Sequence, residues 1–375
     1  MSVIGNTSLA FSEEQAMLLD VAREFCRNRS PIEAVREQLE TETGFDPALW
    51  QEMVELGWTG ISLPEGYGGA GLDVASVVPV LESMGKAMLG TPLVSTTLAA
   101  QLVLRAGNEE QKERILPQLA SGAPATVALL EGGDWGATAI GCRIDEAGVL
   151  SGSKQMVSDA QVAEWFVVSA QGSQGPALAL VPAAAIAADR RQEHVLIDQT
   201  RRAATIDFSG LEVSPENLIQ GDSVAAALRD IALLGALFVA AEATGSCAAC
   251  LDTTVDYLKT RKQFGKLIGS YQALKHPCVD ILCSVDSAKS FVYHAATLVD
   301  NGPLSGDAEV ACRMAKAHAT DALLYASDRA VQFHGGMGFT YECDAQLYIR
   351  RAQWVRQQFG DALHHRKHLG KLLLG

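Results

Sequence analysis

The chain has too few basic residues to be attracted to polyanions. Its 375 residues contain 30 Lys and Arg against 44 Asp and Glu, a formal charge of −14 at pH 7. A field of this sign repels phosphate backbones and anionic lipid headgroups unless basic residues are clustered locally. The composition therefore argues against nucleic acid as a partner.

The N-terminus lacks the features of a secretory signal. The segment MSVIGNTSLAFSEEQ has no basic residues ahead of an apolar stretch, and no part of the chain approaches about 20 uninterrupted apolar residues. The sequence thus predicts neither secretion nor membrane insertion, and we expect a cytoplasmic location.

Cysteine and histidine are present without the spacing of metal sites or a disulfide framework. The eight cysteines are scattered, which is typical of reduced thiols packed as small hydrophobic groups. Cys247 and Cys250 form a C-x-x-C, but no second pair stands near them. His364, His365 and His368 in the tail also lack metal-ligand spacing. No metal site is predicted.

Apolar residues make up 48% of the chain, enough for a large core in one to three domains. Residues 1–122 show helical spacing of apolar residues, beginning with a helix that Ser12 would cap. Residues 123–221 contain short alternating runs typical of strands, and residues 222–375 return to long apolar helices. We predict an α+β fold that is mainly α, with a middle β domain between two helical domains.

Two segments of the last domain suggest nucleotide binding. RKQFG begins at Arg261, whose guanidinium suits a pyrophosphate, and Phe264 would give an apolar wall. QFHGGMGF begins at Gln332, and Gly335 and Gly336 would let the backbone approach a ligand or another chain closely. The first segment alone is only suggestive, and the second is also compatible with a plain connection between helices.

Together these segments resemble the acyl-CoA dehydrogenase family, whose last domain carries R-x-x-F-G and Q-x-x-G-G-x-G at about this separation. The N-terminal segments ELGWTGISLPEGYGGAGLD and GNEEQKERILPQLASG resemble the family's helical domain. The resemblance implies a middle β-barrel, a C-terminal four-helix bundle, and FAD-dependent oxidation of an acyl-CoA to the 2,3-enoyl-CoA. An electron-transfer flavoprotein is the implied electron acceptor.

The resemblance also assigns cofactor contacts. Arg261 and Phe264 match positions that hold the ADP half of a neighbouring subunit's FAD, and Gln332, Gly335 and Gly336 match the approach to its pyrophosphate. Sharing of this kind implies a homo- or hetero-oligomer, a dimer or tetramer.

The β-domain signatures depart from the family pattern. The Thr-Glu-Pro and Gly-Ser-Asp signature is present only as LLEGGDWGA, which retains Glu131. In the next signature Met156 stands in the aromatic place and Ser158 in the hydroxyl place, from which Ser158 would donate to the flavin. The alternative for this second segment is a simple strand of a degenerate domain.

The catalytic base is missing from both positions that the resemblance indicates. One position holds Phe359 and the other holds Gly235. Glu242 lies seven residues after Gly235 on the same helix face, about 10.5 Å along the axis, and is the predicted base. Pairing of Glu242 with a buried Arg or Lys is the structural alternative, and Asp361 is a weaker rival.

The segment DQTRRAATIDFSG resembles a D-x-T-R segment of heteromeric members of the family. Arg201 or Arg202 would face a CoA phosphate or a carboxylate, or would be solvated surface residues. Two functions remain open: an autonomous FAD-dependent acyl-CoA dehydrogenase with Glu242 as base, or a subunit that completes another chain's FAD site and is inactive alone.

Overall fold

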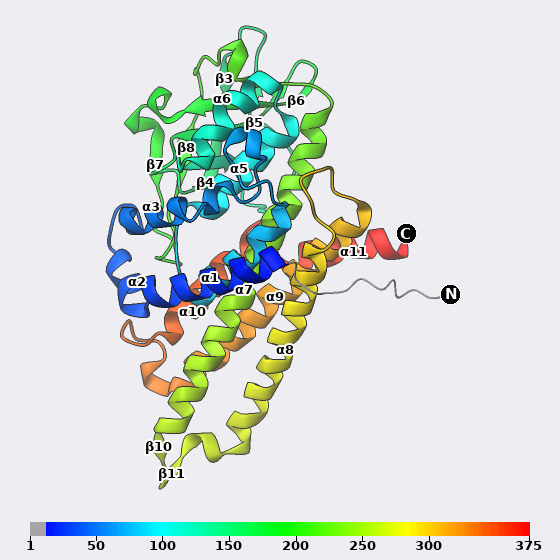
Figure 1. Ribbon diagram of the computed structural model, residues 1–375. Helices are drawn as coiled ribbons and strands as arrows, with labels where there is room; N and C mark the ends of the chain where they lie inside the picture. The colour runs from blue at the N-terminus through cyan, green and yellow to red at the C-terminus, as the bar shows by residue number, and fades with distance from the viewer. Residues whose placement is uncertain (1–12) are drawn as a thin grey trace.

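The computed structural model describes residues 13–375 as a helical part, a β part and a helical bundle (Figure 1). Residues 1–12, which include the predicted cap Ser12 and most of the segment MSVIGNTSLAFSEEQ, lie outside the described residues. The mainly helical fold with helical N- and C-terminal parts is confirmed. One large core cluster runs through all three parts.

The N-terminal part is built around two buried helices. Nearly every residue of α4 and α5 is buried, which explains why their sequences are rich in apolar residues. Polar caps begin the outer helices: Asp46 accepts from the backbone of Ala48, and Asn108 and Gln111 form a reciprocal capping box. The helices are α1 (Glu13–Arg29), α2 (Ile32–Gln38), α3 (Pro47–Glu55), α4 (Val78–Lys86), α5 (Leu93–Ala106) and α6 (Glu109–Ala120).

The middle part consists of two open sheets rather than the predicted barrel. One sheet has the order β3-β2-β5-β6-β9 with β1 also paired to β5, and the other has the order β4-β8-β7. The strands are β1 (Ala125–Ala128), β2 (Arg143–Ile144), β3 (Leu150–Ser151), β4 (Ser153–Ser158), β5 (Trp165–Gly172), β6 (Gly175–Pro182), β7 (Arg191–Glu193), β8 (Ala203–Asp207) and β9 (Leu218–Ile219).

Apolar packing between the two sheets takes the place of closure. Within residues 13–375 no named strand of one sheet pairs with a strand of the other. Backbone hydrogen bonds link β3 only to the turn that follows β8, and β4 is bulged between Lys154 and Val157. Their inner faces share a second core, in which Phe166 of β5 packs edge-on to Phe208 beyond β8. The barrel expectation was therefore wrong for the described residues.

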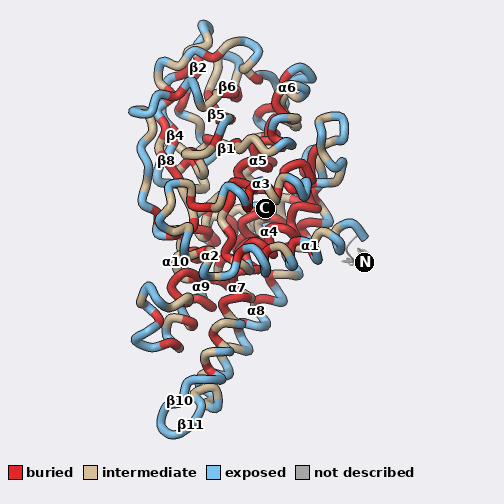
Figure 2. The backbone as a smooth tube through the Cα atoms, turned by 60° about the vertical axis from the view of Figure 1, so that its left-hand side comes forward, coloured by how far each residue is buried: buried red, intermediate tan, exposed pale blue. Residues whose placement is uncertain are grey.

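The C-terminal part is a bundle in which α9 packs against α7, α8, α10 and α11. Its helices are α7 (Ser223–Thr260), α8 (Gln272–Ala296), α9 (Gly306–His334), α10 (Ala345–Gln357) and α11 (Ala362–Leu374), and the strands β10 (Lys262–Gln263) and β11 (Lys266–Leu267) form a hairpin at its tip. α7 is long and apolar enough to cross a membrane, but 72% of its most apolar window is buried inside the protein, as expected of a core helix. Figure 2 shows the exposed tip and the buried region where α4 meets α7.

Two glycines allow α4 and α7 to touch through their backbones. A Cβ added to Gly245 would lie 1.9 Å from the carbonyl oxygen of Glu82, and one added to Gly85 would lie 2.1 Å from that of Glu242. Ser246 also donates a 2.8 Å hydrogen bond to the carbonyl of Gly85. The crossing therefore fixes the position of Glu242, along the axis of α7, relative to the N-terminal part.

We expect Gly245→Ala to lower the free energy of unfolding by about 3 kcal/mol, because backbone atoms cannot move aside for the new methyl group. Urea unfolding of the full chain, followed by circular dichroism, measures the change. The matched control is Gly370→Ala in α11, where a Cβ meets nothing within 4 Å and a gain of about 0.5–1 kcal/mol is expected. Equal midpoints for the two variants would show that the crossing is loosely packed.

Candidate active site

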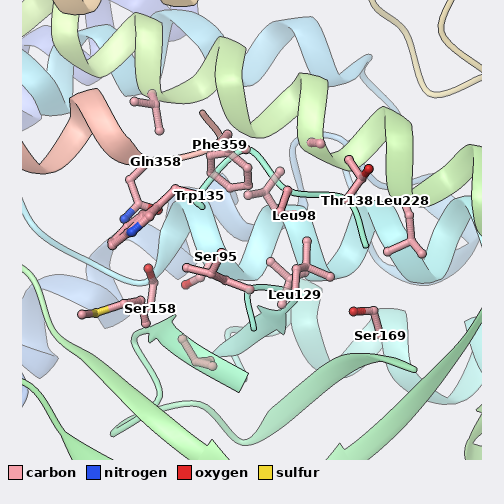
Figure 3. A pocket seen from close by; sticks show the side chains of 18 of the residues that line it. Ser95, Leu98, Leu129, Trp135, Thr138, Ser158, Ser169, Leu228, Gln358 and Phe359 are labelled. Atoms are coloured by element: carbon pink, nitrogen blue, oxygen red, sulfur yellow. The ribbon is translucent and has the colours of Figure 1, made fainter. Parts of the chain in front are cut away.

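A cavity of about 480 Å³ lies where the three parts meet (Figure 3). Its wall comes from α5, from β1 and β4, from the loop 129–140, from α7 and from the α10–α11 turn. Apolar side chains dominate much of the wall, as expected of a site for a largely apolar ligand. Lining residues include Val94, Leu98, Leu129, Trp135, Met156, Ser158, Asp159, Arg201, Val239, Glu242, Trp354 and Phe359.

The two positions from which a base was expected meet at the wall of this cavity, which Phe359 lines. A Cβ added to Gly235 would lie 2.5 Å from ring atoms of Phe359, so the ring packs directly on the backbone of α7. Phe359 has a φ of +55°, an unfavourable conformation for a bulky residue that the tight turn after α10 imposes. The structure thus brings the two sequence positions together, and neither carries a group that can accept a proton.

Glu242 lines the same cavity but is held in an ion pair. Its residue is only 3% exposed, and its Oε1 lies 2.5 Å from Nη2 of Arg201. The structural alternative foreseen for Glu242, pairing with a buried arginine, is therefore what the structure contains. Its Oε2 has no hydrogen-bond partner within the described residues, which leaves one oxygen for a ligand.

The two arginines of the D-x-T-R segment are not solvated, contrary to one expectation. The Arg201 side chain is 10% exposed, and Arg202 donates to the backbone carbonyls of Gln38, Leu39 and Thr41 in the N-terminal part. Arg202 therefore holds two domains together. The structure does not support a role for it in binding a CoA phosphate.

A second buried ion pair fixes the start of this segment. Asp198 Oδ2 lies 2.5 Å from Nε of Arg351 in α10, and the same guanidinium donates to the hydroxyl of Thr200. Burial alone would raise the pKa of Asp198, but the charges of Arg351 and Arg201 outweigh it and hold that pKa below its usual value. The segment 198–202 thus contacts α7, α10 and the N-terminal part at once.

Asp159 is a cavity carboxylate that the sequence did not single out. Its Oδ2 accepts a 2.6 Å hydrogen bond from the hydroxyl of Ser95 in α5. Burial raises the pKa of Asp159 to about 6, against the opposing effects of Ser95 and Arg201. Its position directly after Ser158 was the only signal in the sequence.

Ser158 lies at the end of β4 and lines the cavity as the resemblance requires. Its hydroxyl makes no hydrogen bond within the described part of the chain, although its backbone carbonyl accepts one from Thr126. A donor for a ligand is therefore present. Met156 also lines the cavity but offers no aromatic face.

The remaining predicted residues gather in an open groove of about 630 Å³ at the tip of the bundle. Arg261, Phe264, Gln332, Gly335 and Gly336 all line it, although about 70 residues of sequence separate the two motifs. The Phe264 side chain is 86% exposed, and the Arg261 guanidinium has no partner among residues 13–375. These residues are available to a ligand.

The groove also has room for a ligand at its glycines. A Cβ at Gly335 or Gly336 would meet no atom within 4 Å, so packing within the chain does not require glycine there. At Gly338, in contrast, a Cβ would lie 2.2 Å from the carbonyl of Val331. An exposed guanidinium, an aromatic wall and uncovered backbone fit the diphosphate and ring of an ADP group.

The groove and the cavity lie far apart on one chain. Arg261 is 19 residues beyond Glu242 along α7, which is about 28 Å at 1.5 Å per residue. Histidine and acidic residues form no metal-binding group of three or more among residues 13–375. All eight cysteines are free thiols.

Comparison with known proteins identifies the family. An acyl-CoA dehydrogenase N-terminal domain matches residues 12–123, and an acyl-CoA dehydrogenase C-terminal domain matches residues 230–374. The acyl-CoA dehydrogenase IpdE2 of Mycolicibacterium smegmatis is 32% identical over 350 residues, 93% of this chain and 95% of that protein. The chain belongs to the acyl-CoA dehydrogenase family.

Solved acyl-CoA dehydrogenases have the same fold. A chain of the Tcur3481-Tcur3483 steroid ACAD is 27% identical with a TM-score of 0.84, over 96% of this chain and 98% of that one. Butyryl-CoA dehydrogenase from Megasphaera elsdenii is 25% identical with a TM-score of 0.85, over 98% of this chain and 100% of that one. Acyl-CoA dehydrogenases are FAD-dependent oxidoreductases, which confirms the predicted enzyme class.

Removing Arg201 leaves a buried carboxylate without its counter-charge. We expect Arg201→Met to lower the free energy of unfolding by about 3–5 kcal/mol, and the double variant Arg201→Met/Glu242→Met to lose less because no charge stays buried. The control Arg23→Met breaks an exposed pair with Asp20 and should cost less than about 1 kcal/mol. A double variant as unstable as Arg201→Met would contradict this account.

Lys316 holds the turn that carries Phe359, and its burial should make the free energy of unfolding depend on pH. Its fully buried ammonium donates to the carbonyls of Gly360 at 2.9 Å and Arg356 at 3.2 Å, and burial lowers its pKa to about 7. Above pH 7 the unfolded chain keeps a proton on Lys316 that the folded chain releases. The contribution of Lys316 to stability therefore rises with pH from about 7 toward about 10.4.

Lys316→Met should abolish this rise in the free energy of unfolding with pH, which amounts to at most about 1.4 kcal/mol per pH unit. Urea unfolding at pH 6.5, 7.5 and 8.5 tests it through the difference between wild type and variant. A difference that stays constant over these three values would show that Lys316 does not titrate in this range.

Proposed function

We propose that this chain is a subunit of an FAD-dependent acyl-CoA dehydrogenase that completes a neighbouring subunit's flavin site. The contact between Gly235 and Phe359 carries the proposal, because both positions expected to provide the base meet without a carboxylate. The cavity has no acid there to remove the α-proton of a thioester. In this proposal the base belongs to the neighbouring chain.

The groove at the tip of the bundle (the tip groove) would hold part of the neighbouring subunit's FAD. Arg261 would donate to the diphosphate of FAD, Phe264 would cover the nucleotide, and the backbone at Gly335 and Gly336 would approach the phosphate oxygens with Gln332 beside them. Bound FAD would supply the hydride acceptor for oxidation of the acyl-CoA. The distance of about 28 Å along α7 keeps this groove from serving the chain's own cavity.

The comparisons support an assembly of two different chains. The Tcur3481-Tcur3483 steroid ACAD is named for two components. We propose that this chain likewise pairs with a second acyl-CoA dehydrogenase, one that has a Glu or Asp at the position of Phe359 or Gly235. An electron-transfer flavoprotein would take the electrons from the assembly.

A second candidate function is catalysis in the chain's own cavity by Glu242. The observation in its favour is that Glu242 lines the cavity with Oε2 unpartnered among residues 13–375, while Arg201 holds its other oxygen. Against it stands the spacing of about 10.5 Å along the axis from Gly235. In this case the chain would act alone.

Flavin content separates the two functions. We expect the full chain purified alone to hold well under half an FAD per chain, measured from the flavin absorbance and the protein concentration of one sample. Mixing with a base-carrying partner chain and FAD should give a yellow complex. Arg261→Gln should lower its flavin content, whereas Lys262→Gln, an exposed cation beside the groove, should not.

One FAD per chain in the protein alone would contradict the proposal and support the second candidate. Glu242→Gln would then be assayed with a panel of acyl-CoA thioesters. Loss of activity with flavin retained would assign the base to Glu242, and full activity would remove Glu242 from the mechanism.

A further inference from the structure

The loop between β1 and β2 lines the cavity, and polar contacts fix both of its ends. Glu131 accepts hydrogen bonds from the backbone of Gly141 and Cys142 and pairs with Lys154, a fully buried lysine that also donates to Ser169. The two ends of the segment 132–140 are thus tied to one carboxylate. Glu131 is the only residue of the family signature that this segment retains, and it anchors the loop.

The far side of the loop docks on the helical bundle. The Trp135 indole meets the Trp354 ring of α10 edge to face, with centroids 5.4 Å apart and planes at 90°. At Gly136 the backbone packs on His364 of α11, and a Cβ there would lie 2.3 Å from Nδ1. Asp134 closes the turn by accepting from the backbone of Gly136 at 3.0 Å. The loop is therefore held against α10 and α11, and the indole itself rests on Trp354.

The indole shares the cavity with the residues that the resemblance sets against the flavin ring. Figure 3 shows Trp135 between Gln358 and Phe359 on one side and Ser158 on the other, and all four residues line the cavity. The resemblance places the flavin ring against Ser158 and Met156. A planar ring system and the indole cannot occupy the same space in front of these residues.

We infer that Trp135 excludes the flavin ring from this chain's own cavity. The inference rests on the proposed function and explains it, because a chain that cannot take a flavin itself can still complete the site of another. Trp135 is thus a specificity-determining residue: with its indole in place, the cavity is open to apolar groups but not to the isoalloxazine ring. Displacing the indole would cost its contact with Trp354 and its apolar burial.

The test is FAD binding by the full chain, measured by quenching of flavin fluorescence rather than by activity. We expect Trp135→Gly and Trp135→Ala to bind FAD about tenfold or more tightly than wild type, and Trp135→Phe to bind like wild type because a ring still fills the space. Two truncating variants are used so that one poorly folded protein, detected by circular dichroism, does not decide the result.

The outcomes distinguish this inference from the proposed function. Wild type and both truncated variants without flavin would overturn the inference alone. Wild type that binds one FAD per chain would overturn both. Wild type that binds weakly, with binding restored by Trp135→Gly or Trp135→Ala but not by Trp135→Phe, is the expected result.

Discussion

The structure depends most on the buried charges of the segment 198–202. Asp198 and Arg201 sit inside the protein only because Arg351 of α10 and Glu242 of α7 neutralise them. A buried charge without its partner costs several kcal/mol, so the β part can dock on the bundle in one arrangement only. Arg202 then joins the same segment to the N-terminal part. Arg201 and Arg202 of this segment also line the cavity.

The features that could be predicted from the sequence depend mostly on residues that lie close together along the chain. Arg261 and Phe264 are three residues apart at one hairpin, and Gly335 and Gly336 follow the helix that packs beside α7. The groove at the tip of the bundle therefore follows once the helices are placed. The caps at Asp46 and Asn108 are equally local. Predictions of this kind need only short-range chemistry.

Which distant residues pair with one another could not be decided from the sequence alone. Glu242 and Arg201 are 41 residues apart on a helix and a loop of different domains, and an acid alone in an apolar helix has the same sequence whether it is a base or half of an ion pair. The barrel failed for a similar reason, because closure depends on edge pairing that alternating residues do not encode. Trp135 left a signal, an aromatic residue in a glycine-rich loop, but its contact with Trp354 spans more than 200 residues.

Gly235 and Phe359 depend on each other. The ring of Phe359 occupies the space beside α7 that any side chain at 235 would need, with contacts of 2.5 Å to an added Cβ. An acid at 235 would therefore collide with Phe359, and an acid at 359 would leave a gap over Gly235 beside buried Lys316 and its turn. Recovering a base at either position requires repacking of the other. Loss of the base is thus built into the packing of α7 against the α10–α11 turn, which accords with a role for this chain outside its own cavity.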